Sequence, residues 1–243
     1  MSLRALTAQT RIELLLTLRR SESLLVTLGI PVGILVFFSK VDALNTTLVH
    51  PVQFLVPGTL ALAVMSAAMV SLGIATGYER RYGALKRLGS TPLSRGGLLA
   101  AKSANVLLIE IFQAVVIVGT GLALGWSASA RVFPAIGLLL LGTVAFAGIG
   151  MLLAGTLRAE ANLAMANALF LVLLFLGGMA YPLARLPGAF EDFARALPAA
   201  ALSDSVRKVL AGASFPTGSF LVLLAWAVVA PLAAAHWFRW TED

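Results

Sequence analysis

The sequence contains no cysteine and very little charge. Among its 243 residues there are no Cys, two His and only 12% Asp, Glu, Lys and Arg. The absence of cysteine excludes a disulfide scaffold and thiolate metal sites, while the redox compartment stays undecided. Soluble domains carry about 25% charged residues. The low charge therefore excludes an ordinary soluble domain.

Apolar residues take the place of the missing charge. Hydrophobic side chains make up 59% of the chain, and the mean hydropathy is +0.93. The net charge is +7, but the cations cluster at the ends of apolar segments, where they orient membrane helices and meet anionic headgroups. The composition predicts an all-α integral membrane protein in contact with lipids, and it argues against a nucleic-acid partner.

Six apolar segments are candidates to cross a bilayer, which needs ~20 residues per helix. The first is short and is interrupted by Pro31. We expect no cleavable signal peptide, because charged residues interrupt the apolar pattern of the first twenty positions. The predicted spans are Leu24–Phe38, Val52–Thr76, Ser103–Trp126, Val132–Leu157, Ala161–Met179 and Phe220–Phe238.

Two further segments are too charged to span but keep apolar stripes. Residues 1–22 predict a helix that lies at the membrane interface. Residues 182–218 predict two short amphipathic helices, which fit a re-entrant hairpin at the external interface. The first places Phe190 and Phe193 opposite Glu191, and the second places Arg207 on its polar flank. Residues 1–243 then form a single transmembrane domain.

The longest polar interruption, residues 78–97, determines the predicted topology. Lys and Arg resist translocation, so a basic loop between two spans stays in the cytoplasm. With six spans, both termini are then cytoplasmic as well. The charged residues of this loop are Glu79, Arg80, Arg81, Lys86, Arg87 and Arg95.

The same loop contains a helical pattern. Tyr78, Tyr82 and Leu85 recur at i, i+4 and i+7 and predict one apolar face of a short helix. Gly89 and Pro92 predict its end. From the residues alone, the segment is either a loop at the lipid surface or a docking element for a cytoplasmic partner.

The run Glu79-Arg80-Arg81-Tyr82-Gly83-Ala84-Leu85-Lys86-Arg87-Leu88, followed by Thr91-Pro92-Leu93-Ser94 and Lys102, resembles ABC-2 type transporter permeases. The order of predicted segments is similar to that family over nearly the whole length. In the family, the loop after the second span holds a coupling helix that seats in a cleft of the ATP-binding subunit. The resemblance implies coupling to that partner through Glu79, Arg80, Arg81, Tyr82, Leu85, Lys86, Leu88, Arg158 and Glu160.

The resemblance also implies a function. The chain would be the permease subunit of an ATP-driven exporter in the cell (inner) membrane, moving a drug, lipid or glycan outward between the second and fifth spans. It would pair with a second permease chain, identical or related. ATP and Mg²⁺ would bind on separate ATP-binding cassette subunits, so this chain would have no cofactor, metal or catalytic residue of its own.

Four polar residues inside the spans are candidates to line a substrate path: Glu110, Gln113, Asn162 and Asn167. A carboxylate within a span is costly and faces a partner. Glu110 therefore either contacts a cationic substrate or is satisfied by water or Asn105. The amides either line the path or join helices, and the Gly73/Gly77 pair either marks a close helix contact or arises by chance.

The sequence gives little support for a catalytic, metal or nucleotide site on this chain. His50 and His236 fall on opposite sides of the predicted membrane, so they cannot share a metal or catalytic site. Residues 96–103 approach a P-loop, but Ala101 stands where glycine is required. The alternatives to an ABC permease are a gradient-driven carrier or channel, which needs several buried charges, and a membrane scaffold that recruits a signalling protein.

Overall fold

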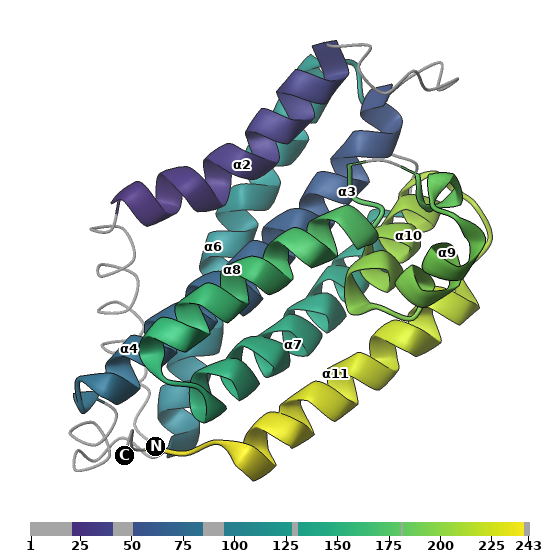
Figure 1. The fold of residues 1–243 in the computed structure, drawn as a ribbon. Helices are drawn as coiled ribbons and strands as arrows, with labels where there is room; N and C mark the ends of the chain where they lie inside the picture. The colour runs from purple at the N-terminus through teal and green to yellow at the C-terminus, as the bar shows by residue number, and fades with distance from the viewer. Residues whose placement is uncertain (1–20, 41–50, 85–94, 128–130, 181, 241–243) are drawn as a thin grey trace.

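The computed structural model describes residues 21–40, 51–84, 95–127, 131–180 and 182–240, and within these ranges it contains helices and no strand. Three short elements, η2 (Leu183–Arg185), α9 (Gly188–Arg195) and α10 (Pro198–Leu210), gather at one end of the bundle (Figure 1). The longer segments are α2 (Ser21–Lys40), the consecutive α3 (Pro51–Met65), η1 (Ser66–Ser71) and α4 (Leu72–Arg81), then α6 (Arg95–Ala123), α7 (Val132–Thr156), α8 (Ala159–Leu176) and α11 (Thr217–Trp237).

Five helices in the described part of the chain are long and apolar enough to cross a membrane: Pro51–Arg81, Ala101–Ala123, Val132–Thr156, Ala159–Leu176 and Thr217–Trp237. The prediction of an all-α membrane protein is confirmed. Within α2, the apolar stretch Leu28–Lys40 is shorter than a full span. The first of the six predicted spans therefore stays a prediction.

The second predicted span is the central helix of the bundle. Its most apolar stretch is 89% buried, against 22–39% for the other four candidates. α2, α6, α7, α8 and α10 all pack against α3, η1 or α4. A helix that is apolar on every face is one that is buried on every side. The outer helices instead bury one face and leave the other for lipid.

Glycines allow the neighbouring helices to approach this central helix closely. A Cβ atom at Gly150 of α7 would lie 2.6 Å from the carbonyl oxygen of Met69, and one at Gly73 would lie 3.0 Å from that of Gly150. A Cβ at Gly77 would lie 2.5 Å from the amide nitrogen of Asn162 in α8. The Gly73/Gly77 pair is therefore a packing motif that small residues make possible.

The central helix widens where α7 comes closest. η1 is a π-helical segment, and the N–H of Leu72 that follows it bonds to the carbonyl of Ala67, five residues back. Such single-turn insertions within α-helices are rare. Here the insertion places the backbone of Met69 directly against Gly150, so backbone meets backbone at the centre of the bundle.

The central helix is longer than predicted. It continues past Thr76 to Arg81, so the first residues of the predicted 78–97 loop form its last turn. Gly83 ends this turn at φ +67°, the left-handed conformation that glycine adopts at helix ends. Tyr78 and Tyr82 stack on this turn with ring centres 6.2 Å apart. Leu85, the third member of the predicted face, lies outside the described residues.

The apolar faces of the two short amphipathic helices before the last span differ in burial. Leu202 and Val206 of α10 are fully buried, and Ser203 donates a 2.5 Å hydrogen bond to the carbonyl of Gly177. In α9, Phe190 and Phe193 stay about 60% exposed. α10 is thus packed into the bundle, while α9 presents its rings outward, as an interfacial helix does to lipid.

Arg207 does not lie on an exposed polar flank, as its position in the sequence predicted. Its guanidinium carbon lies 3.7 Å from the centre of the Phe54 ring, and its Nη2 donates a 2.7 Å hydrogen bond to the carbonyl of Gly178. Desolvation lowers the pKa of Arg207 to about 10, against the opposing effect of Asp204. Arg207 therefore stays cationic at neutral pH and ties α10 to α3 by a cation–π contact.

Replacing Gly150 by Ala should push α7 away from the central helix, because the added Cβ meets the backbone carbonyl of Met69 rather than a flexible side chain. We expect a loss of about 1–3 kcal/mol, the usual cost of overpacking, measured by unfolding titration in mixed micelles. Gly137→Ala is the matched control on the same helix, because a Cβ there meets nothing within 4 Å. Equal stability of the two variants would contradict the assigned packing.

Candidate functional site

The last turn of the central helix holds three other helices through three consecutive residues. Lys102 of α6 donates to Glu79 with Nζ–Oε1 and Nζ–Oε2 distances of 2.8 and 2.6 Å. Nη2 of Arg80 donates a 2.5 Å hydrogen bond to the carbonyl of Leu157, at the end of α7. Arg81 forms an ion pair with Glu160 of α8. Consecutive helical residues project about 100° apart, so the three side chains reach three different neighbours.

Two of these contacts are buried. The side chain of Lys102 is only 4% exposed and that of Glu79 22%, so each charge offsets part of the water that the other has lost. Arg80 is 5% exposed and meets the C-terminal end of α7. The last carbonyls of a helix lack intrahelical partners and carry the negative end of the helix dipole. A buried cation is therefore well placed there.

The third contact lies at the surface. The side chains of Arg81 and Glu160 are 43% and 61% exposed, and exposed ion pairs of this kind contribute only 0–1 kcal/mol. Glu160 stands in the first turn of α8, where the helix dipole favours an acid. Arg158, just before α8, and Tyr82 are exposed at this same end. We call this end, where α4 and α7 end and α6 and α8 begin, the charged end.

All the predicted coupling residues that the structure describes lie at the charged end: Glu79, Arg80, Arg81, Tyr82, Arg158 and Glu160. Leu85, Lys86 and Leu88 lie outside the described residues. Sequence reasoning did not assign Lys102 and Leu157 to this group. Lys102 belongs to the motif that resembles ABC-2 permeases, so the sequence contained a signal for its role. Leu157 takes part through its backbone carbonyl, which no sequence pattern reveals.

The model of one protein family matches most of the chain. It is that of the ABC-2 type transporter, and it covers residues 4–211. The chain belongs to the ABC-2 type transporter family. No curated protein is similar enough in sequence to give a match.

The family confirms the resemblance found in the basic loop. This ABC-2 chain is the membrane-embedded permease component of an ABC transporter, a transport subunit that is not itself catalytic and has no cofactor of its own. Permeases of this family associate with an ATP-binding cassette subunit.

The structure separates the polar residues that the sequence proposed as a substrate path. Asn162 of the permease is fully buried, and its Nδ2 donates a 2.9 Å hydrogen bond to the carbonyl of Gly73. Asn167, in the same helix, is exposed and donates to the carbonyl of Leu163. Glu110 and Gln113 are buried in α6, 9% and 1% exposed. The four residues therefore do not line one continuous surface within this chain.

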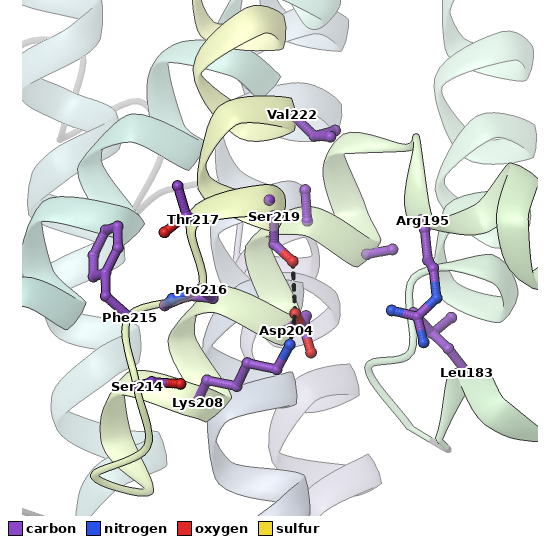
Figure 2. A pocket seen from close by; sticks show the side chains of 13 residues that line it. Leu183, Arg195, Asp204, Lys208, Ser214, Phe215, Pro216, Thr217, Ser219 and Val222 are labelled. Carbon is purple, nitrogen blue, oxygen red and sulfur yellow. Dashed lines mark hydrogen bonds and ion pairs between the residues drawn. The ribbon is translucent and has the colours of Figure 1, made fainter.

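A second polar region of the ABC-2 permease lies at the opposite end, beside α9 and α10. A cleft of about 640 Å³ lies there. Arg195 lies on one side of it and Asp204 near its centre (Figure 2). Asp204 accepts a 2.6 Å hydrogen bond from Ser219 and pairs with Lys208 at 2.8 Å. Arg195 pairs with Glu191 at 2.5 Å. The hydrogen bond from Ser219 joins α10 to the start of α11, whereas the two ion pairs lie within α10 and within α9.

Removing either member of the Glu79–Lys102 pair should destabilise the permease by about 3 kcal/mol, because the remaining charge loses the opposite charge beside it at a position largely shielded from water. The double variant Glu79→Gln/Lys102→Met should lose less than the sum of the two single variants, with an interaction energy of about 1–3 kcal/mol. Unfolding titrations in mixed micelles measure both.

The exposed pair provides the control for this cycle. Arg81→Ala and Glu160→Ala should show an interaction energy below about 1 kcal/mol. If the losses at Glu79 and Lys102 were additive, with an interaction energy no larger than that of the exposed pair, the buried contact would not hold α4 to α6.

Proposed function

We propose that this permease is the membrane subunit of an ATP-driven exporter, which moves an amphipathic drug, lipid or glycan outward. Two such chains, identical or related, would associate with two ATP-binding cassette subunits that carry ATP and Mg²⁺. The observation that carries the proposal is the cluster of bonds at the charged end. The segment that resembles the family's coupling loop begins there, at the end of the central helix, which contacts most of the other helices.

In this proposal, Tyr82, Leu85, Lys86 and Leu88 contact the ATP-binding subunit, together with Arg158 at the neighbouring turn. The side chain of Glu79 is 22% exposed and Arg80 is 5% exposed, and both bond to neighbouring helices of the bundle. They act as positioning residues that fix the last turn of α4 to its neighbours. Arg81 and Glu160, exposed and paired, stand between the two groups.

This arrangement provides a route for mechanical work. A displacement of the loop after Gly83 acts on α4 first, and α4 is bonded to α6, α7 and α8 within one turn. ATP-driven closure of the partner subunits would therefore move several helices together instead of bending one loop. The cytoplasmic side of the membrane is assigned to the charged end because it carries the basic loop.

The proposed substrate path runs between the central helix and α8, the second and fifth spans. At the charged end this junction is closed by the Asn162–Gly73 hydrogen bond and by the Arg81–Glu160 ion pair. Opening toward the cytoplasm would require these two contacts to break. Because the second contact is exposed and weak, most of the free energy needed for opening is the cost of breaking the buried Asn162–Gly73 hydrogen bond.

The variant Leu85→Asp/Leu88→Asp should abolish co-purification of ATPase activity with the permease from its native membrane, because two charges would be placed on the predicted docking face. The ATPase activity of the affinity-purified complex measures this. Ala189→Asp, which adds a charge at an exposed position of α9, should keep the activity. Retention of full activity by the double variant would contradict docking through this loop.

Because the chain lacks cysteine, its orientation can be tested with single cysteines in an otherwise unchanged protein. Arg87→Cys should be protected from a membrane-impermeant maleimide in intact cells and should react after permeabilisation. Ala189→Cys, at the opposite end, should react in both conditions. Labelling of position 87 from outside would reverse the topology and remove the proposed coupling role of the loop.

A further inference from the structure

An apolar cavity of about 430 Å³ lies between α6, α7 and the central helix. α6 and α7 both pack against α3, which forms the floor of the cavity. Its rim includes Ile111, Ile136 and Leu140, which are 46–60% exposed on the outer surface of the bundle. The cavity therefore opens to the side of the protein that faces lipid, and its size is within the range of small-molecule sites, about 300–1,000 Å³.

The lining is apolar at every position except Glu110. The other lining residues are Leu60, Ala63, Val64, Leu107, Ile111, Ala114, Val115, Ile136, Leu139 and Leu140. A single acid among apolar walls is the pattern of a site in which shape selects the body of a ligand and one polar group orients it.

Glu110 is only half satisfied by the protein. Its Oε2 accepts a 2.7 Å hydrogen bond from the hydroxyl of Thr143 in α7. Its Oε1 is buried and has no hydrogen-bond partner among the described residues. No described Lys or Arg forms an ion pair with it, and the nearest cation along α6, Lys102, is already paired with Glu79. A buried acceptor without a partner is costly, and in a membrane span such an acid marks a functional site.

We propose that this cavity binds a lipophilic amine, whose ammonium group donates to Glu110 while its apolar body lies against α6 and α7. The amine supplies the hydrogen-bond donor and the opposite charge that Glu110 lacks. Because Oε1 is covered in the unliganded chain, the side chain rotates toward the cavity when the ligand enters. The proposal rests on the transport function and names the class of cargo for one site.

The cavity also sets the direction in which the ligand lies. On α7 the lining positions, 136, 139 and 140, precede Thr143 and lie toward the end that holds α9 and α10. On α6 they run from Leu107 to Val115, and Glu110 stands near the beginning of that stretch. The amine is therefore near the middle of the membrane, and the apolar body extends toward the end away from the charged end.

Photolabelling tests this with the full chain in lipid nanodiscs and without the ATP-binding subunit. The probe is dodecylamine that carries a diazirine on its alkyl chain, and the adducts are located by mass spectrometry. We expect adducts on residues 107–115 and 136–140 that excess dodecylamine removes. Dodecanol, which has no charge, should compete about tenfold less well or worse, because hydrogen bonds to charged groups are stronger than neutral ones.

Two variants test the two halves of the site. Glu110→Gln should lower saturable labelling about tenfold or more, while Ala114→Phe should remove it by filling the cavity with Glu110 intact. The control variant Asp192→Asn removes an acid of α9 that does not line the cavity, and it should be labelled as strongly as the unchanged protein. Size-exclusion profiles identify any variant that is misfolded. If Glu110→Gln is misfolded, Ala114→Phe still tests the location of the site.

Equal labelling of Glu110→Gln and the unchanged chain, or equal competition by dodecanol, would overturn the assignment of an amine. Labelling that survives Ala114→Phe would overturn the cavity as its location. None of these readouts depends on ATP hydrolysis or on the coupling loop. Failure of the binding site is therefore distinguishable from failure of the proposed export function.

Discussion

A helix that is surrounded by protein leaves little of its surface for water, so the charges at its end find partners in neighbouring helices. The central helix of this permease meets that constraint within one turn. Glu79 takes its partner from α6, Arg80 takes the terminal carbonyl of α7, and Arg81 takes an acid of α8. The rest of the bundle is arranged so that these three neighbours end or begin at the same level.

The same constraint explains the packing along the helix. A central helix packed on several sides needs small residues where backbones cross, and Gly73, Gly77 and Gly150 stand at those crossings. The buried amide of Asn162 then adds a hydrogen bond to the carbonyl of Gly73, and Gly77 makes room for it, since a Cβ at Gly77 would lie 2.5 Å from Nδ2 of Asn162. The glycines and the charged turn together make the central helix, α7 and α8 one unit at the charged end.

This unit connects the two proposed sites. The proposed coupling loop leaves the central helix just after Gly83, and the amine cavity lies farther along the same helix, floored by Leu60, Ala63 and Val64. α6 takes part in both, through Lys102 near the charged end and Glu110 near its middle. A movement of the loop that tilts the central helix against α6 would change the shape of the cavity. In this way, work at one end of the bundle would reach a ligand near its middle.

Much of the fold followed from the sequence, because long apolar runs and clustered cations leave few arrangements in a bilayer. The last four predicted spans agree with α6, α7, α8 and α11 to within a few residues, apart from the earlier start of α6 at Arg95. The family was evident from the basic loop, since its order of charges, glycine and proline is specific. Sequence therefore determined the class of protein, the position of most helices and the candidate coupling residues.

Only the tertiary structure decided which helix is central, because the mean hydropathies of the five candidate spans differ little, from 1.8 to 2.3, while their burial differs greatly. It also decided the different environments of Asn162 and Asn167, two amides of one helix of which the first is buried in the bundle and the second is exposed on its surface. The placement of Arg207 over Phe54 and the pairing of Lys102 with Glu79 were likewise decided by packing. The physical reason is that local sequence sets how apolar a helix is, but a side chain's partner depends on which neighbour its face meets.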